Sequence, residues 1–117
     1  MTVQERALGD VTILDVNGRM TVDAPRDARL VDTVRCVLAE GRRQILVNME
    51  QVPQIDSSGL CDLVTAYTST VRQGGALKLV KVPARVRDLL EITRILPVIE
   101  AYRAEADAVA SFARVSS

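Results

Sequence analysis

The sequence contains no histidine and no tryptophan, and one phenylalanine and two tyrosines are the only aromatic residues among its 117. The lack of histidine excludes a Ser–His–Asp triad, imidazole acid–base chemistry and the commonest zinc ligand. So few aromatic side chains leave almost no surface on which the bases of single-stranded nucleic acid could stack. Basic and acidic residues number 15 each, so the chain also lacks the basic excess that attracts nucleic acid or an anionic membrane. We therefore expect no nucleic-acid partner.

Long apolar segments and a disulfide framework are missing as well. No run approaches the ~20 apolar residues that span a bilayer, and residues 1–6 do not resemble a secretory signal. The two cysteines, Cys36 and Cys61, are too few for a disulfide framework, and each lies in a predicted helix. These observations predict a cytoplasmic protein with reduced thiols and without direct membrane insertion.

The common motifs of catalysis are absent too. The sequence has neither a Gly-x-Ser-x-Gly elbow nor a glycine-rich phosphate loop. Glu50, Asp56 and Asp62 are close in sequence, but they do not follow the ligand pattern of a metal site. We therefore predict a protein that is not an enzyme and that has no metal and no cofactor of its own.

What is present is the composition of one folded domain, which we expect to span residues 1–117, with 48% hydrophobic and 26% charged residues. Hydrophobic periodicity predicts strands at 3–8, 11–17, 45–49, 76–80 and 98–102, and helices at 23–41, 58–73, from 83 onward and at 105–114. Strand–helix–strand units recur three times, which indicates parallel strands with right-handed crossovers. The first two strands form an antiparallel pair. The predicted fold class is therefore α/β, with a mixed, mainly parallel sheet, an antiparallel N-terminal edge strand and about four helices.

A polar cluster, Asp56-Ser57-Ser58-Gly59, lies between a buried strand and an apolar-periodic helix. One interpretation is that Ser57 or Ser58 caps the helix with its hydroxyl. The other is that a serine here receives a phosphate, which the unpaired N–H groups and the positive end of the helix dipole favour. Spacing alone leaves both interpretations open.

The helix after this cluster has apolar residues at helical spacing, which predict a buried stripe formed by Leu60, Leu63, Val64, Tyr67 and Val71. Cys61 lies one turn beyond Ser57 and is expected to be a small buried apolar residue rather than a redox sensor. Asp62, in the first turn, is expected only to complement the helix dipole.

Four sequence blocks together resemble the STAS family, which is named for sulphate transporters and anti-sigma factor antagonists. They occur in family order at Ile13–Met20, Ile45–Met49, Ile55–Leu60, and Gly74–Val80 followed by Val86–Thr93. The resemblance covers nearly the whole chain. Its short Asp-Ser-Ser-Gly-Leu motif gains specificity because it falls between the appropriate strand and helix.

In bacterial antagonists of this family, the serine directly after the aspartate is phosphorylated by an anti-sigma factor that is also a serine kinase. The resemblance therefore implies phosphorylation at Ser57, with Ser58 as the weaker candidate. It implies a partner-binding surface made by Thr21, Asp56, Ser57, Ser58, Gly59 and Leu60. Asp56 would position the loop, and Gly59 would allow the kinase to approach closely. The unphosphorylated form would bind the anti-sigma factor and free the sigma factor, and a serine phosphatase would restore that form.

Two positions depart from the family pattern. Thr21 stands where antagonists typically have an aspartate near the partner-binding surface, and Arg94 replaces a glycine that is usual after the third helix. The resemblance also leaves other roles open: a scaffold subunit of stressosome-type complexes, or the small STAS subunit of an ATP-binding-cassette lipid transporter. A hydrolase with Ser57 as its nucleophile is a third alternative. The N-terminal edge strand could in addition pair with a second copy to form a homodimer.

Overall fold

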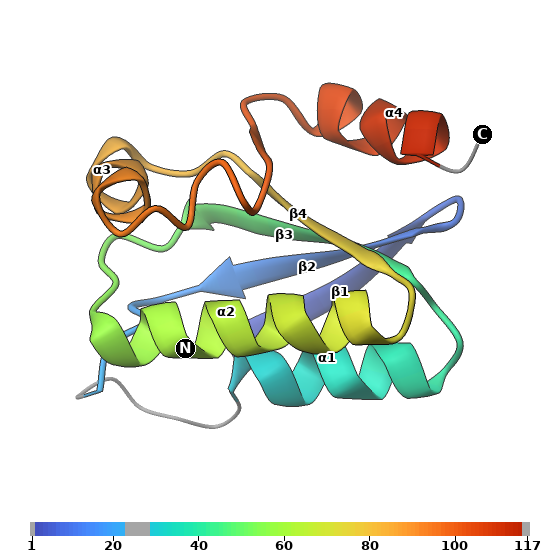
Figure 1. Cartoon of the computed structure of the whole chain (residues 1–117), viewed down its shortest axis with the longest axis horizontal. Coiled ribbons are helices and arrows are strands. Elements are labelled where there is room, and N and C mark those ends of the chain that lie inside the picture. Colours follow the sequence, from blue (N-terminus) through green and yellow to red (C-terminus); the bar gives the residue numbers. More distant parts are fainter. Residues whose placement is uncertain (1, 23–28, 116–117) are drawn as a thin grey trace.

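The computed structural model describes residues 2–22 and 29–115, of which 113–115 are described by their backbone alone. Five strands and four helices follow one another in the described chain (Figure 1). Their order is β1 (Thr2–Leu8), β2 (Val11–Asn17), α1 (Leu30–Ala39), β3 (Gln44–Gln51), α2 (Ser57–Arg72), β4 (Ala76–Val80), α3 (Ala84–Ile92), β5 (Ala101–Tyr102) and α4 (Glu105–Val115). The helix start predicted at 23–25 lies outside the described residues.

The strands form one sheet in the order β1-β2-β3-β4-β5. β1 pairs with β2 in antiparallel register, with Thr2 opposite Asn17 and Leu8 opposite Val11. The pairs β2–β3, β3–β4 and β4–β5 are all parallel. This arrangement confirms the predicted fold class, because each parallel connection needs a crossover that a helix supplies.

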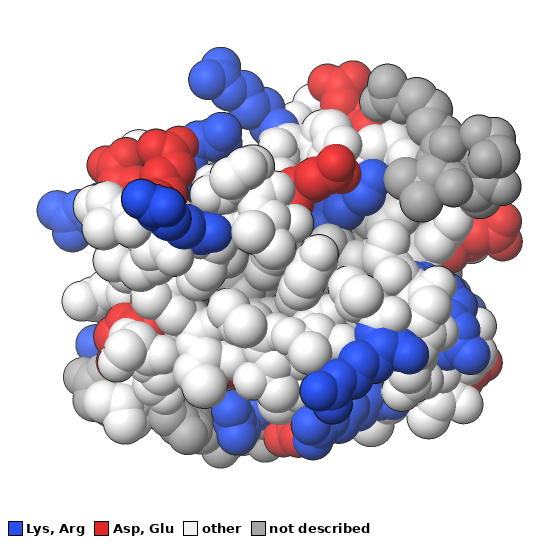
Figure 2. All heavy atoms as spheres, viewed as in Figure 1, with Lys and Arg blue, Asp and Glu red and all other residues white. Residues whose placement is uncertain are grey.

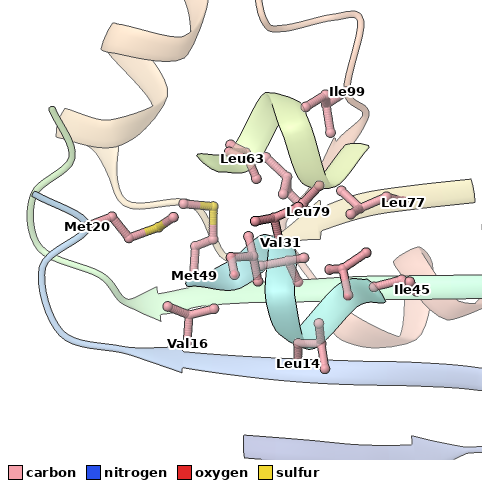
Figure 3. Close-up of a cluster of buried hydrophobic side chains, with 14 of the residues drawn as sticks. Leu14, Val16, Met20, Val31, Ile45, Met49, Leu63, Leu77, Leu79 and Ile99 are labelled. Atoms are coloured by element: carbon pink, nitrogen blue, oxygen red, sulfur yellow. The ribbon is translucent and has the colours of Figure 1, made fainter. Parts of the chain in front are cut away.

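Helices cover both faces of the sheet, with α1 and α2 side by side on one face and α4 on the other (Figure 1). The larger core lies under α1 and α2, where Figure 3 shows strand residues meeting helix residues such as Val31 and Leu63. A smaller cluster lies under α4 and contains Val11, Ile13, Leu46, Val80, Ala108 and Phe112. Two buried faces explain why β3 has no polar alternation in its centre.

A buried lysine of the sheet contacts α4. Lys78 of β4 is 5% exposed, and its ammonium group lies 2.9 Å from the Ser111 hydroxyl and 3.0 Å from a Glu100 carboxylate oxygen. The same ammonium lies 4.8 Å from the centre of the Phe112 ring. Such a charge is tolerated in a core only when it is paired and hydrogen-bonded, and Lys78 meets both conditions.

The last strand is shorter than predicted. β5 contains two residues instead of the expected 98–102, and Val98 is 63% exposed. Pro97 has no N–H to donate to a ladder, and the chain instead turns so that the Ile99 amide donates to the Ile95 carbonyl. Within the described part of the chain, β5 therefore pairs only with Leu79 and Val80 at the end of β4.

Arg94, the residue that departs from the family glycine, has a backbone φ of +61°. This is the left-handed region, where glycine is the residue without a steric penalty. The geometry gives a physical reason for glycine at this position, and the arginine adopts it at a cost of roughly 1 kcal/mol.

Candidate functional site

Ser57 is the first residue of α2 and follows the loop that leaves the carboxyl end of β3. In parallel sheets, binding sites form where loops leave the carboxyl ends of strands. The start of α2 and the start of α3 both lie at that end of the sheet (Figure 1). The predicted serine cluster therefore lies at the edge of the sheet where binding sites form in this topology.

Asp56, and neither of the serines, caps α2. Its carboxylate accepts a hydrogen bond from the Gly59 amide at 3.1 Å, and its other oxygen accepts one from the Val22 amide at 2.9 Å. The interpretation of Ser57 or Ser58 as the cap is wrong, because Asp56 occupies that position with extended backbone. These amide donors, with Val22 the strongest, hold the pKa of Asp56 below its ordinary value.

The two serines differ in their surroundings. Ser57 is exposed, and within the part of the chain that the structure describes no group hydrogen-bonds to its hydroxyl. Ser58 is half-buried and already takes part in an interaction. The cap formed by Asp56 therefore leaves the Ser57 hydroxyl available on the surface at a helix N-terminus.

Gly59 is required by packing within the chain. A Cβ at this position would lie 2.1 Å from the Met20 carbonyl oxygen and 2.7 Å from an Ile55 side-chain carbon. The Met20 carbonyl also accepts from the Asp56 amide at 3.2 Å, and Met20 forms an isolated bridge with Ile55. Residues 20–22 are thus held directly against the start of α2.

The other predicted partner-binding residues, Thr21 and Leu60, are less accessible than Ser57. Thr21 lies between Met20 and Val22, so the chain brings it beside the Asp56 loop, but it is only 8% exposed. Leu60 is half-buried and packs against the main core. Of the predicted residues, Ser57 is therefore the one that the structure leaves most open to a partner.

Asp62 has a larger role than complementing its own helix dipole. Its side chain is buried, and its two carboxylate oxygens accept from the amides of Leu30 at 2.8 Å and Val31 at 2.9 Å. Arg29, at the start of α1, makes no cap of its own but places its guanidinium 3.9 Å from the same carboxylate. A residue of α2 thus caps α1. The apolar spacing of this helix did not indicate the role, because Asp62 lies outside the buried stripe predicted from the sequence.

The stripe predicted on α2 is only partly buried. Leu63 is fully buried, but Val64 is 40% and Val71 is 48% exposed, and Cys61 is exposed as well. The buried face of α2 is mostly made of smaller residues and consists of Gly59, Asp62, Leu63, Ala66 and Thr70. Small side chains let α2 lie close to the sheet, which turns the flanking valines toward solvent.

The outer surface of α2 carries almost no charge. Of its 16 residues, Asp62 is buried and Arg72 lies in the last turn, and the others are uncharged. Figure 2 shows the resulting broad white face over α2, with charged side chains around it. Surface helices normally carry charged residues on the outer face. A charge-depleted face with exposed apolar residues is typical of a protein-binding surface.

Comparison with known proteins establishes the family. The family model of the STAS domain matches residues 2–108, which is most of the chain. The chain belongs to the STAS domain family. Among curated protein sequences, none matches it.

Solved structures with this fold include anti-sigma factor antagonists. One from Mycobacterium paratuberculosis is 19% identical, with a TM-score of 0.79 over 95% of this chain and 92% of the other. The Bacillus cell-fate determinant SpoIIAA in its phosphorylated form is 15% identical, with a TM-score of 0.70 over 94% and 98%. A sulfate transporter family protein from Wolinella succinogenes is 21% identical, with a TM-score of 0.76 over 96% and 93%. At these identities the likeness shows the STAS fold alone.

No described helix of this STAS domain is long and apolar enough to cross a membrane. Within the same residues, no three side chains of the histidine, cysteine, aspartate and glutamate types cluster as metal ligands.

Proposed function

We propose that this STAS domain is an anti-sigma factor antagonist that is switched by phosphorylation of Ser57. The unphosphorylated domain binds an anti-sigma factor that is also a serine kinase, and thereby frees the sigma factor. Phosphorylation releases the partner, and a serine phosphatase restores the binding form. ATP is the substrate of the partner, and the domain itself catalyses nothing.

The observation that carries the proposal is the Ser57 hydroxyl, which is exposed and has no hydrogen-bond partner among the described residues, beside a cap that Asp56 already provides. A serine that served as the cap would have its hydroxyl oxygen engaged with a helix amide and so less open to a kinase. Here the helix keeps its cap when Ser57 is modified. The dipole at the N-terminus of α2 also stabilises an added phosphate.

The uncharged face of α2 explains how such a phosphate would release a partner. A phosphoserine adds about 1.5 to 2 negative charges at neutral pH. At Ser57 these charges lie at one end of a face that has exposed Val64 and Val71 and almost no charge. A partner with an apolar surface would have to desolvate the phosphate in order to dock. A cost of only 1.4 kcal/mol weakens binding tenfold, so the domain does not need to refold.

The test is a pull-down from native lysate with the wild type, Ser57→Ala and Ser57→Asp, with bound proteins identified by mass spectrometry. The control is Ala110→Asp, which adds the same charge at an exposed position of α4, on the opposite face of the sheet from α2 (Figure 1). We expect the wild type, Ser57→Ala and the control to retain a serine kinase that Ser57→Asp loses. Equal retention by all four proteins would contradict the switch. An ATP-binding-cassette ATPase or other STAS subunits in every eluate would instead support one of the alternative roles.

A further inference from the structure

The sheet is open along the first part of β4. Among the described residues β5 pairs only with the last two residues of β4, so Ala76–Lys78 have a neighbouring strand on the β3 side alone. A hollow of about 250 Å³ is bordered by four consecutive residues, Gly75–Lys78. The Leu77 side chain packs into the core under α2, whereas Lys78 contacts α4 on the other face (Figure 3). A hollow that both residues border therefore lies along the edge of the strand.

Leu77 presents two unpaired backbone groups to this edge. The N–H and C=O groups of successive strand residues point alternately to the two neighbouring strands. The Ala76 amide donates to the Arg43 carbonyl on the β3 side at 2.9 Å. The Leu79 amide donates to the Glu100 carbonyl on the β5 side at 2.8 Å. The Leu77 N–H and C=O therefore point to the β5 side, where no backbone group of the described residues bonds to them.

These unpaired groups favour a backbone as the occupant of the hollow. Leu77 is 2% exposed, and a buried peptide group without a partner is unfavourable. A strand added at an open sheet edge supplies both a donor and an acceptor. The hollow is also smaller than the roughly 300–1,000 Å³ of typical small-molecule sites.

The other residues that border the hollow indicate which side chains the occupant carries. Tyr67 and Val71 of α2 border it together with Pro97 and Val98, which precede β5. Val71 and Val98 are exposed apolar residues. The charged groups at the hollow, Lys78 and Glu100, lie 3.0 Å apart and offset each other. The walls therefore suit an apolar segment.

Basic side chains lie beyond one end of the hollow. Arg72 is in the last turn of α2, and the Arg43 guanidinium donates to the side chain of Gln73 at 3.3 Å, just before the turn into β4. Neither arginine forms an ion pair with a carboxylate of the described residues. Figure 2 shows basic side chains around this end of α2.

The nearby acidic residues leave a small basic excess at this end. Glu40 pairs with Arg42 at 3.8 Å, and Asp10 borders another hollow together with Arg43. With Arg72 counted, the local net charge is about +1. An acidic residue next to the apolar segment would therefore be attracted here.

We propose that the open edge of β4 binds an extended peptide segment of a partner protein. The segment adds a short strand beside Ala76–Lys78 and forms hydrogen bonds with the N–H and C=O of Leu77. Its apolar side chains lie against Val71 and Val98, and an adjoining acidic residue lies near Arg72. With 16 residues, α2 is about 24 Å long, so this site is at the opposite end of the helix from Ser57 and does not depend on the phosphorylation switch.

The test is an amide NMR titration of the full chain with two capped peptides, Asp-Glu-Val-Thr-Val-Val and its reverse, which cover both strand directions. We expect at least one of them to shift the Leu77 amide resonance saturably, with a Kd below about 1 mM, and to slow exchange of that amide hydrogen. Lysines in place of the two acidic residues should weaken this peptide about tenfold. N-methylation of its two central residues removes strand donors and should weaken it about fivefold or more.

Val98→Asp tests the hollow in the protein. Val98 is 63% exposed, so the fold should persist, and the new carboxylate should weaken the acidic peptide about tenfold. The matched control is Ile92→Asp, which changes an exposed β-branched residue at the end of α3, outside the hollow, and should bind like the wild type.

Three results would overturn the proposal: no saturable shift of Leu77 with either peptide, equal weakening by the two variants, or undiminished binding of the N-methylated peptide. Undiminished binding of the lysine peptide would overturn the role of Arg72.

Discussion

Replacing Asp62 by alanine should destabilise the domain strongly, although the residue lies on a helix whose own cap is intact. The buried Asp62 carboxylate accepts the two amides that begin α1, at 2.8 and 2.9 Å from Leu30 and Val31. Loss of the acceptor leaves two buried N–H groups without a partner, at about 1–3 kcal/mol each. Partial access of water to the helix end offsets some of that cost. We therefore expect a loss of about 2–4 kcal/mol in the free energy of unfolding.

Urea unfolding followed by circular dichroism measures this loss. For a chain of this length, a loss of about 3 kcal/mol corresponds to a fall of roughly 10 °C in Tm. Asp88→Ala is the matched control, because Asp88 is an exposed aspartate inside α3, and it should change the free energy by less than about 0.5 kcal/mol. Asp62→Asn keeps one acceptor oxygen and should fall between the wild type and Asp62→Ala.

Amide hydrogen exchange locates the effect. In Asp62→Ala, the amides of Leu30 and Val31 should exchange faster relative to those of β3, because the start of α1 opens locally before the sheet does. A loss below about 1 kcal/mol, or unchanged protection at Leu30 and Val31, would refute the assignment of Asp62 as the cap of α1.

Two further predictions concern Gly59 and Asp15. Gly59→Ala places a Cβ 2.1 Å from the Met20 carbonyl oxygen, so the unfolding free energy should fall by at least about 2 kcal/mol; an unchanged thermal midpoint would contradict this. The Arg6 guanidinium, and secondly the Asn48 amide, lower the pKa of Asp15 from 3.8. The resulting stability is present above pH 3.8 and is lost as the pH falls through the lower folded-state pKa. Urea midpoints between pH 5 and 2 should therefore fall less steeply for Asp15→Asn than for the wild type, and parallel curves would refute the link.

Much of the fold follows from local pattern. The antiparallel first pair, the apolar run of β3 and the helical spacing of α1, α3 and α4 are visible in the sequence, and the structure confirms them. The position of the serine cluster between β3 and α2 was equally predictable. These features depend on residues that are close in sequence, within one or two helical turns or in consecutive strands. Hydrophobic periodicity predicts such features well.

The details of the candidate site were not predictable in the same way. Asp56, Ser57 and Ser58 are all acceptable caps by residue type, and the choice of Asp56 follows from its second bond to Val22, 34 positions earlier. Gly59 is needed because Met20 lies against α2 there, and Asp62 is buried because α1 begins against it. Each of these contacts joins residues that are distant in sequence.

The sequence by itself determined the order of elements, the mixed sheet and the place of Ser57, because local periodicity and turn residues encode them. The tertiary structure alone decided that Asp62 caps α1, that Val64 and Val71 face solvent, and that β5 is reduced to two residues. Which side of a helix is buried, and which charges meet, depends on how elements pack across the sheet, and the pattern within one element carries little of that information.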